Sequence, residues 1–186
     1  MKNSGNLTVT TPSDREIAMS RVFDAPRNLV FDAYTRPELV TRWLGVFGGW
    51  TFDVCEIDLS IGGTYRYVWD GPEGATLGIR GTFMEIARNE RIVCTERFDA
   101  PFDHGEAIDT VTFVEHAGKT TLSITVLAPS KEARDGMLKS GMAEGVTASF
   151  DNMDGVLAQQ TAPTYRRSTS DGSPRPGSRC AARSAS

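Results

Sequence analysis

The chain has 186 residues, of which 39% are hydrophobic and 24% are charged, as in an ordinary globular protein. Its length predicts one domain with a core of its own. No apolar run of about 18 residues is present, so we expect no membrane span, and the start of the chain lacks the apolar stretch of a secretory signal. The cysteines Cys55, Cys94 and Cys180 are too few and too far apart for a disulfide framework or a zinc cluster, so the expected compartment is the cytoplasm.

The net charge of −4 is unevenly distributed along the chain. Residues 166–186 contain five arginines and one aspartate, a net charge of +4, so the preceding residues carry −8. Such a body repels phosphate backbones, which argues against nucleic acid as its partner. Residues 161–186 are rich in Ser, Arg, Pro and Gly, and we predict a disordered basic tail there. A solvated extension is favoured over an RNA- or membrane-binding one.

The first part of the chain predicts one strand and two short helices. Residues 1–13 are polar and expected to be flexible, ahead of a domain over residues 14–160. Alternating apolar residues over 15–23 predict a half-buried strand. Pro26 and then Pro37 each suit the first position of a short helix.

A series of strands and one long helix follow. Apolar residues with a period of two predict strands from residue 50 onward, and Tyr65, Tyr67 and Trp69 share one sheet face. Further strands are predicted near residues 77–86, 91–98, 107–115 and 120–127. A long amphipathic helix is then expected from about Ser130 to Ala158, with an apolar ridge of Leu138, Met142, Val146, Phe150, Met153 and Leu157. The predicted fold is α+β, with a curved antiparallel sheet of about seven strands wrapped around this helix.

The chain resembles the helix-grip fold of the START/Bet v 1-like superfamily. Within it, the chain is similar to the family related to the C-terminal domain of the activator of the Hsp90 ATPase. The resemblance covers about residues 14–158 and rests on RVFDAPRNLVFDAYTRPELVTRWLG, GGTYRYVWDGPEG, RGTFMEIARNERIVCTERF and GMAEGVTASFDNMDGVLA. Leu44 and Val46 stand where the family often has a Trp and a Pro, so ligand identity is not carried over.

The resemblance implies a cavity between sheet and helix, in a scaffold whose members differ in function. Some members bind hydrophobic small molecules, some are cyclase- or hydrolase-like, and the namesakes stimulate a chaperone ATPase in stress responses. The namesakes also carry a separate N-terminal domain, for which the residues before Arg15 leave no room, so a full co-chaperone role is disfavoured. Related domains often pair, which leaves a homodimer open.

The candidate ligand contacts are mostly aromatic. Tyr and Trp combine an apolar body with a polar tip, which suits the wall of a pocket, although such residues also build ordinary cores. The aromatic candidates are Trp43, Trp50, Phe52, Tyr65, Tyr67, Trp69 and Phe150, joined by Met142 and Val146 on the helix. Arg80, Cys94 and Glu96 are polar candidates, with strand phase near Gly81 undecided. The alternatives are an ion pair on the solvent face for Arg80 and Glu96 and a small buried apolar role for Cys94.

The sequence assigns no catalytic residue, metal or cofactor. It lacks the phosphate-binding, nucleophile-elbow and HExxH motifs, and His104 with Asp103 and Glu106 is a weak metal-ligand pattern. We therefore expect a protein that binds a small hydrophobic or amphiphilic molecule. One alternative is an enzyme that uses Glu96 or Arg80 in the same cavity, and another is a module that acts on a chaperone.

Overall fold

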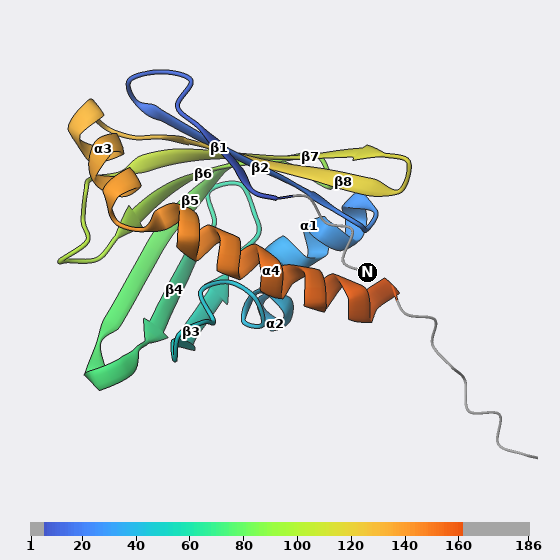
Figure 1. The fold of residues 1–186 in the computed structure, drawn as a ribbon, viewed down its shortest axis with the longest axis horizontal. Helices are drawn as coiled ribbons and strands as arrows, with labels where there is room; N and C mark the ends of the chain where they lie inside the picture. Colours follow the sequence, from blue (N-terminus) through green and yellow to red (C-terminus); the bar gives the residue numbers. More distant parts are fainter. Residues whose placement is uncertain (1–5, 162–186) are drawn as a thin grey trace, which may run out of the picture.

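The computed structural model describes residues 6–161, so the predicted basic tail, except for Thr161, lies outside the described residues. One antiparallel sheet in the order β1-β2-β8-β7-β6-β5-β4-β3 curves around helix α4 (Figure 1). The strands are β1 (Thr8–Thr10), β2 (Glu16–Phe23), β3 (Thr51–Ile57), β4 (Thr64–Asp70), β5 (Thr76–Ala87), β6 (Arg91–Phe98), β7 (Ala107–His116) and β8 (Lys119–Leu127). The helices are α1 (Arg27–Thr35), α2 (Pro37–Val40), the 3-10 turn η1 (Pro72–Gly74), α3 (Lys131–Lys139) and α4 (Met142–Thr161). This confirms the predicted α+β helix-grip architecture.

The sheet has eight strands where the sequence predicted about seven. The additional strand is β1, which lies within residues 1–13, where we expected a flexible segment. It pairs antiparallel with β2, with Thr8 opposite Ser20 and Thr10 opposite Ala18, and Val9 packs against the core. Main-chain hydrogen bonding to an existing edge therefore orders a segment whose side chains are largely polar.

The predicted long helix is in fact two helices. Ser130 caps the start of α3 by accepting a hydrogen bond from the N–H of Ala133 (3.1 Å). The chain leaves the helical conformation at Gly141, whose φ of +81° favours glycine, and α4 begins at the next residue. The apolar ridge is broken accordingly, because Leu138 on α3 is 37% exposed. No helix within residues 6–161 is long and apolar enough to cross a membrane.

A buried arginine ties α4 to the sheet. Arg21 lies on the inward side of β2 and is 6% exposed. Its Nη2 atom forms ion pairs with Asp151 (2.8 Å) and Asp154 (2.6 Å) of α4. Two carboxylates therefore compensate the charge of this inward guanidinium, which makes its burial tolerable.

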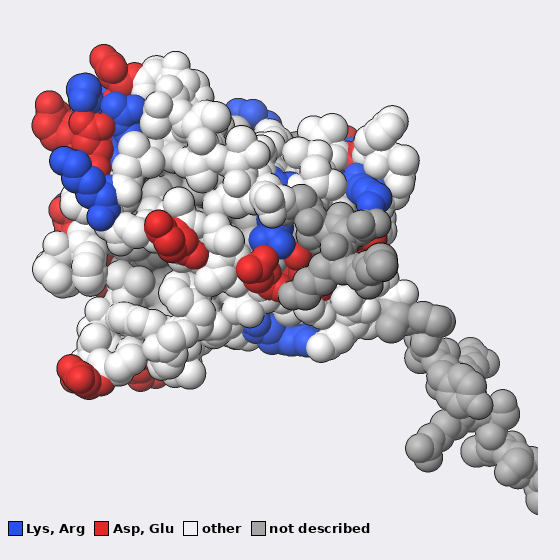
Figure 2. Space-filling model, in the orientation of Figure 1, with Lys and Arg blue, Asp and Glu red and all other residues white. Residues whose placement is uncertain are grey.

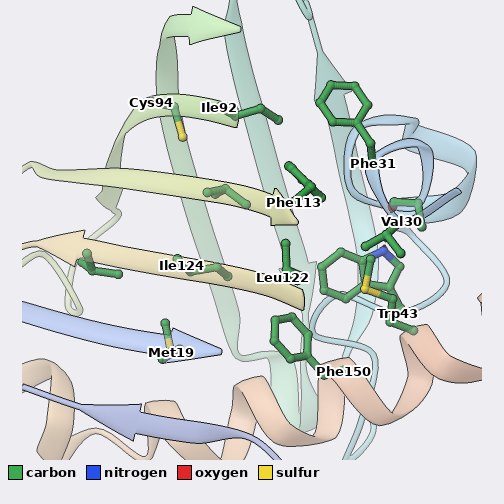
Figure 3. Close-up of a cluster of buried hydrophobic side chains, with 14 of the residues drawn as sticks. Met19, Val30, Phe31, Trp43, Ile92, Cys94, Phe113, Leu122, Ile124 and Phe150 are labelled. Atoms are coloured by element: carbon green, nitrogen blue, oxygen red, sulfur yellow. Dashed lines mark hydrogen bonds between the residues drawn. The ribbon is translucent and has the colours of Figure 1, made fainter. Parts of the chain in front are cut away.

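One half of the interior is closely packed. The inward side chains of β2, β7 and β8 pack against α1 and α4, and Phe150, Met153, Val156 and Leu157 of α4 are buried. Figure 3 shows Phe150 beside Trp43, with ring centroids 6.1 Å apart, and Phe23 lies 5.3 Å from Phe150. The Trp43 Nε1–H donates to the carbonyl of Ala33 (2.8 Å), so its polar atom is already satisfied. This half is a solid core.

Two glycines give opposite expectations for stability. A Cβ atom added at Gly81 would overlap the carbonyl oxygen of Thr95 and lie 2.5 Å from Tyr65 Cε1, whereas one added at Gly155 would meet nothing within 4 Å. We expect Gly81→Ala to lower the free energy of unfolding by about 2 kcal/mol or more through overpacking. Gly155→Ala, on an exposed helix position, should raise it by up to about 1 kcal/mol. Urea unfolding followed by circular dichroism measures both, and equal effects would contradict the β4–β5–β6 packing.

Candidate ligand-binding site

Strand register brings two carboxyl groups together on the inner face of the sheet. Along β6, Ile92, Cys94 and Glu96 alternate inward, and Cys94 is opposite Asp109 of β7. Glu96 is opposite Ala107, so Glu96 and Asp109 are diagonal neighbours on the same face. The structure thus resolves the strand phase that the sequence left open, and it turns Glu96 into the interior.

The two carboxyl groups interact, and this interaction acts on the pKa of each of them. Asp109 is 8% exposed and Glu96 is partly buried. Burial raises the pKa of Glu96 to about 7, and burial together with the neighbouring Glu96 charge raises the pKa of Asp109 well above its ordinary value. Asp109 Oδ1 is buried with no hydrogen-bond partner. Within residues 6–161, no lysine, arginine or histidine forms an ion pair with either group.

Tyrosines and a thiol surround this pair. Burial raises the pKa values of Tyr34 of α1 and Tyr67 of β4, and the charge of the neighbouring acidic groups raises them further. Tyr65 donates its hydroxyl hydrogen to the carbonyl of Thr95 (2.8 Å). Burial raises the pKa of the Cys94 thiol, so it remains protonated and fits the small buried apolar role. The interior is therefore acidic and aromatic at this point.

An aromatic wall continues along β3 and β4. The rings of Phe52 and Trp69 lie 4.7 Å apart, and Tyr67 lies 5.9 Å from each of them, measured between centroids. The Trp69 Nε1–H donates to the carbonyl of Leu44 (3.0 Å), and a Cβ at Gly45 would lie only 2.6 Å from Nε1. Trp69 is thereby fixed against the loop that precedes β3.

That loop is also fastened to α4. The N–H of Gly45 donates to Ser149 Oγ (3.0 Å), and Asn152 Nδ2 donates to the carbonyl of Val46 (2.9 Å). Phe47, in the same loop, is 40% exposed and lies against Gly145. The loop therefore holds the helix at a set distance from β4.

The half of the interior beside this wall is less tightly closed than the solid core. Apolar side chains on the first turns of α4 point inward but remain half-buried. The apolar side chains that face them from β3, β4 and β5 are half-buried as well. These half-buried residues are Phe52, Ile57, Tyr67, Ile79, Met142 and Val146. In Figure 2, charged side chains crowd the end of the molecule that carries α3, and few lie over the start of α4. A surface with few charged side chains thus borders the half of the interior that is less tightly closed.

Four predicted contacts lie elsewhere. Arg80 is on the outer face of β5, because Gly81 faces inward opposite Tyr65, and Arg80 pairs there with Asp99 together with Arg66. It is therefore removed from the candidate ligand contacts. Trp43 and Phe150 belong to the solid core. Trp50 packs against Gly71 in the turn after β4.

The sequence analysis missed Asp109 and Tyr34. Asp109 occupies an inward position in the alternating series Ala107, Asp109, Val111, Phe113, so a charged residue at an apolar position of that period was the available signal. Tyr34 carried no separate signal, because a tyrosine on the apolar face of a short helix is typical of a core.

The groove that the structure shows does not coincide with the Glu96–Asp109 pair. An open groove of about 410 Å³ lies between the β1 region and α4, lined in part by Val9, Ala143 and Thr147. None of the predicted ligand contacts lines it.

Within residues 6–161, no three His, Cys, Asp or Glu side chains are arranged to hold a metal ion.

The curved antiparallel sheet and the long C-terminal helix that it surrounds define a helix-grip domain. The model of the family described as activator of Hsp90 ATPase homolog 1-like protein matches residues 24–158, and the chain belongs to this family. A search of the curated proteins found no match.

Solved structures agree with this assignment. A protein from Rhodobacter sphaeroides is 30% identical, with 83% of this chain and 99% of that chain covered and a TM-score of 0.79. A protein from Mycobacterium smegmatis shows the same fold at 22% identity, with 81% and 96% covered and a TM-score of 0.73. A protein from Nitrosomonas europaea does so at 22% identity, with 81% and 99% covered and a TM-score of 0.69.

The raised pKa of Glu96 predicts a pH-dependent stability. In the unfolded chain a glutamate titrates near about 4.3, whereas the folded value is about 7. Since the folded pKa is the higher one, the stability present below about pH 4 is lost progressively as pH rises towards 7. We expect Glu96→Gln to reduce the fall in unfolding free energy between pH 5 and 8 by about 1–3 kcal/mol.

Urea unfolding at pH 5, 6, 7 and 8 measures this difference. Glu56→Gln is the matched control, because Glu56 is an exposed glutamate on β3 of the same sheet. Parallel curves for wild type and Glu96→Gln would show that Glu96 is not desolvated in the fold.

Proposed function

We propose that this domain binds a small, largely apolar molecule between α4 and the inner face of β3–β6. The observation that carries the proposal is the Glu96–Asp109 pair, placed inward beside an aromatic wall with Asp109 Oδ1 unsatisfied. Burying such groups costs folding free energy unless they are compensated. A bound molecule that donates a hydrogen bond to Oδ1 would supply that compensation.

The composition of the wall supports this choice. Ligand sites are mostly apolar, with a few polar groups that orient the ligand. The inner face offers the rings of Phe52, Tyr67 and Trp69 and, deeper, the two carboxyl groups. Met142 and Val146 oppose them from α4 and are only half-buried. Adaptable methionine side chains are common at such surfaces.

A second candidate function is catalysis in the same place. A carboxyl group whose pKa is about 7 is suited to act as a general base at neutral pH. Such an enzyme would still bind its substrate against the same residues. Loss of turnover with retained binding in Glu96→Gln would favour it, and unchanged turnover would exclude Glu96 as the base.

Binding is tested with the full-length protein and the uncharged dye N-phenyl-1-naphthylamine, whose fluorescence increases in apolar surroundings. We expect saturable binding by the wild type and a Kd raised by about tenfold in Tyr67→Ala, because the variant removes a ring from the wall. Met84→Ala is the control, since Met84 is 51% exposed. Absence of saturable binding, or equal loss in both variants, would refute the proposal. Native mass spectrometry of the purified protein would identify a natural occupant.

A further inference from the structure

Among the described residues 6–161, no cationic side chain forms an ion pair with the carboxyl pair. Tyr34 of α1, Tyr67 of β4 and Cys94 of β6 are the titratable groups near the pair, and each is neutral or acidic. Tyr65 of β4 likewise contributes no positive charge. Met142 and Val146 lie on the first turns of α4, and their half-buried side chains point towards the sheet. Both side chains are uncharged.

The inward arginine of the sheet does not fill this role. Arg21 lies on β2 and is occupied by Asp151 and Asp154 of α4. The arginines of β4 and β5, Arg66 and Arg80, pair with Asp99 on the outer face. Negative charge that develops on the pair therefore has no partner within the described residues 6–161.

The geometry of Asp109 requires a donor. Asp109 is more than nine-tenths buried, and its Oδ1 atom is buried without a hydrogen-bond partner. A carboxylate, sulfate or phosphate on a ligand would add like charge beside it, which is unfavourable in a region of low dielectric constant. An alcohol or amide would satisfy Oδ1 but would leave the negative charge uncompensated.

The neighbouring rings favour a positive charge as well. Tyr65 and Tyr67 have ring centroids 5.1 Å apart, and Phe83 lies 5.4 Å from Tyr65. The faces of aromatic rings attract organic cations, and aromatic sites with carboxylates bind ammonium groups well. We propose that the ligand is an organic cation, with an apolar body along the β3–β4 aromatic wall and an ammonium group against Glu96 and Asp109. This inference rests on the proposed function and names the charge of its ligand.

Binding of a cation should displace a proton from the pair. The positive charge favours the ionised form of both carboxyl groups, so a proton leaves the site for the solvent when the ammonium group binds. The affinity for a cation that cannot itself lose a proton should therefore rise between pH 6 and pH 8. The affinity for a neutral ligand of the same length should not rise.

The test compares three ligands with one apolar chain: octyltrimethylammonium, 1-octanol and octyl sulfate. Isothermal titration of the full-length protein, in about 0.15 M salt to screen the acidic surface, should give a Kd for the ammonium compound about tenfold below that of octanol. Octyl sulfate should bind most weakly. Glu96→Gln and Asp109→Asn should each reduce the preference for the cation, and Glu56→Gln should leave it unchanged.

The outcomes separate the two proposals. If octanol or octyl sulfate binds as tightly as the ammonium compound, the cationic ligand class is wrong and the binding function stands. If the preference for the cation survives in both carboxyl variants, the pair is not its binding site and the inference fails. If no compound binds saturably, the proposed function fails with it.

Discussion

Glu96 and Asp109 lie side by side in the interior because β6 and β7 are paired with Cys94 opposite Asp109. Side chains alternate strictly along a strand, so this register leaves neither carboxyl group a route to solvent on the outer face. Desolvation of the pair is then unavoidable, and retention of a proton is the response available to it. The chemistry proposed for the interior depends on this single register.

The rest of the fold determines how much of the interior is closed. From Phe150 onward, α4 is held by Arg21 and packs Phe150 and Met153 into the solid core. The loop before β3 is hydrogen-bonded to Ser149 and Asn152, next to the first turns of α4, whose inward side chains remain half-buried. A single helix therefore serves as a core element at one end and as a cover at the other.

The sequence predicted the fold well, because alternating strands, Pro-initiated helices and family motifs agree with one another. It also placed Tyr65, Tyr67 and Trp69 on one face, since a period of two leaves no other arrangement. It left the direction of Arg80 open, because that direction depends on the pairing of Gly81 with Tyr65, and strand pairing is a long-range property. The break at Gly141 was missed because the apolar ridge continues in the sequence across it.

The division of the interior separates the residues that hold the fold from those that would select a ligand. Substitutions at Phe150 or Phe23 act on close packing and are costly. Positions such as Ile79 and Val146 are only half-buried, so changes there disturb little packing. Proteins with this fold can therefore acquire new ligand specificities through substitutions at the half-buried, ligand-facing positions, while selection preserves the residues of the solid core.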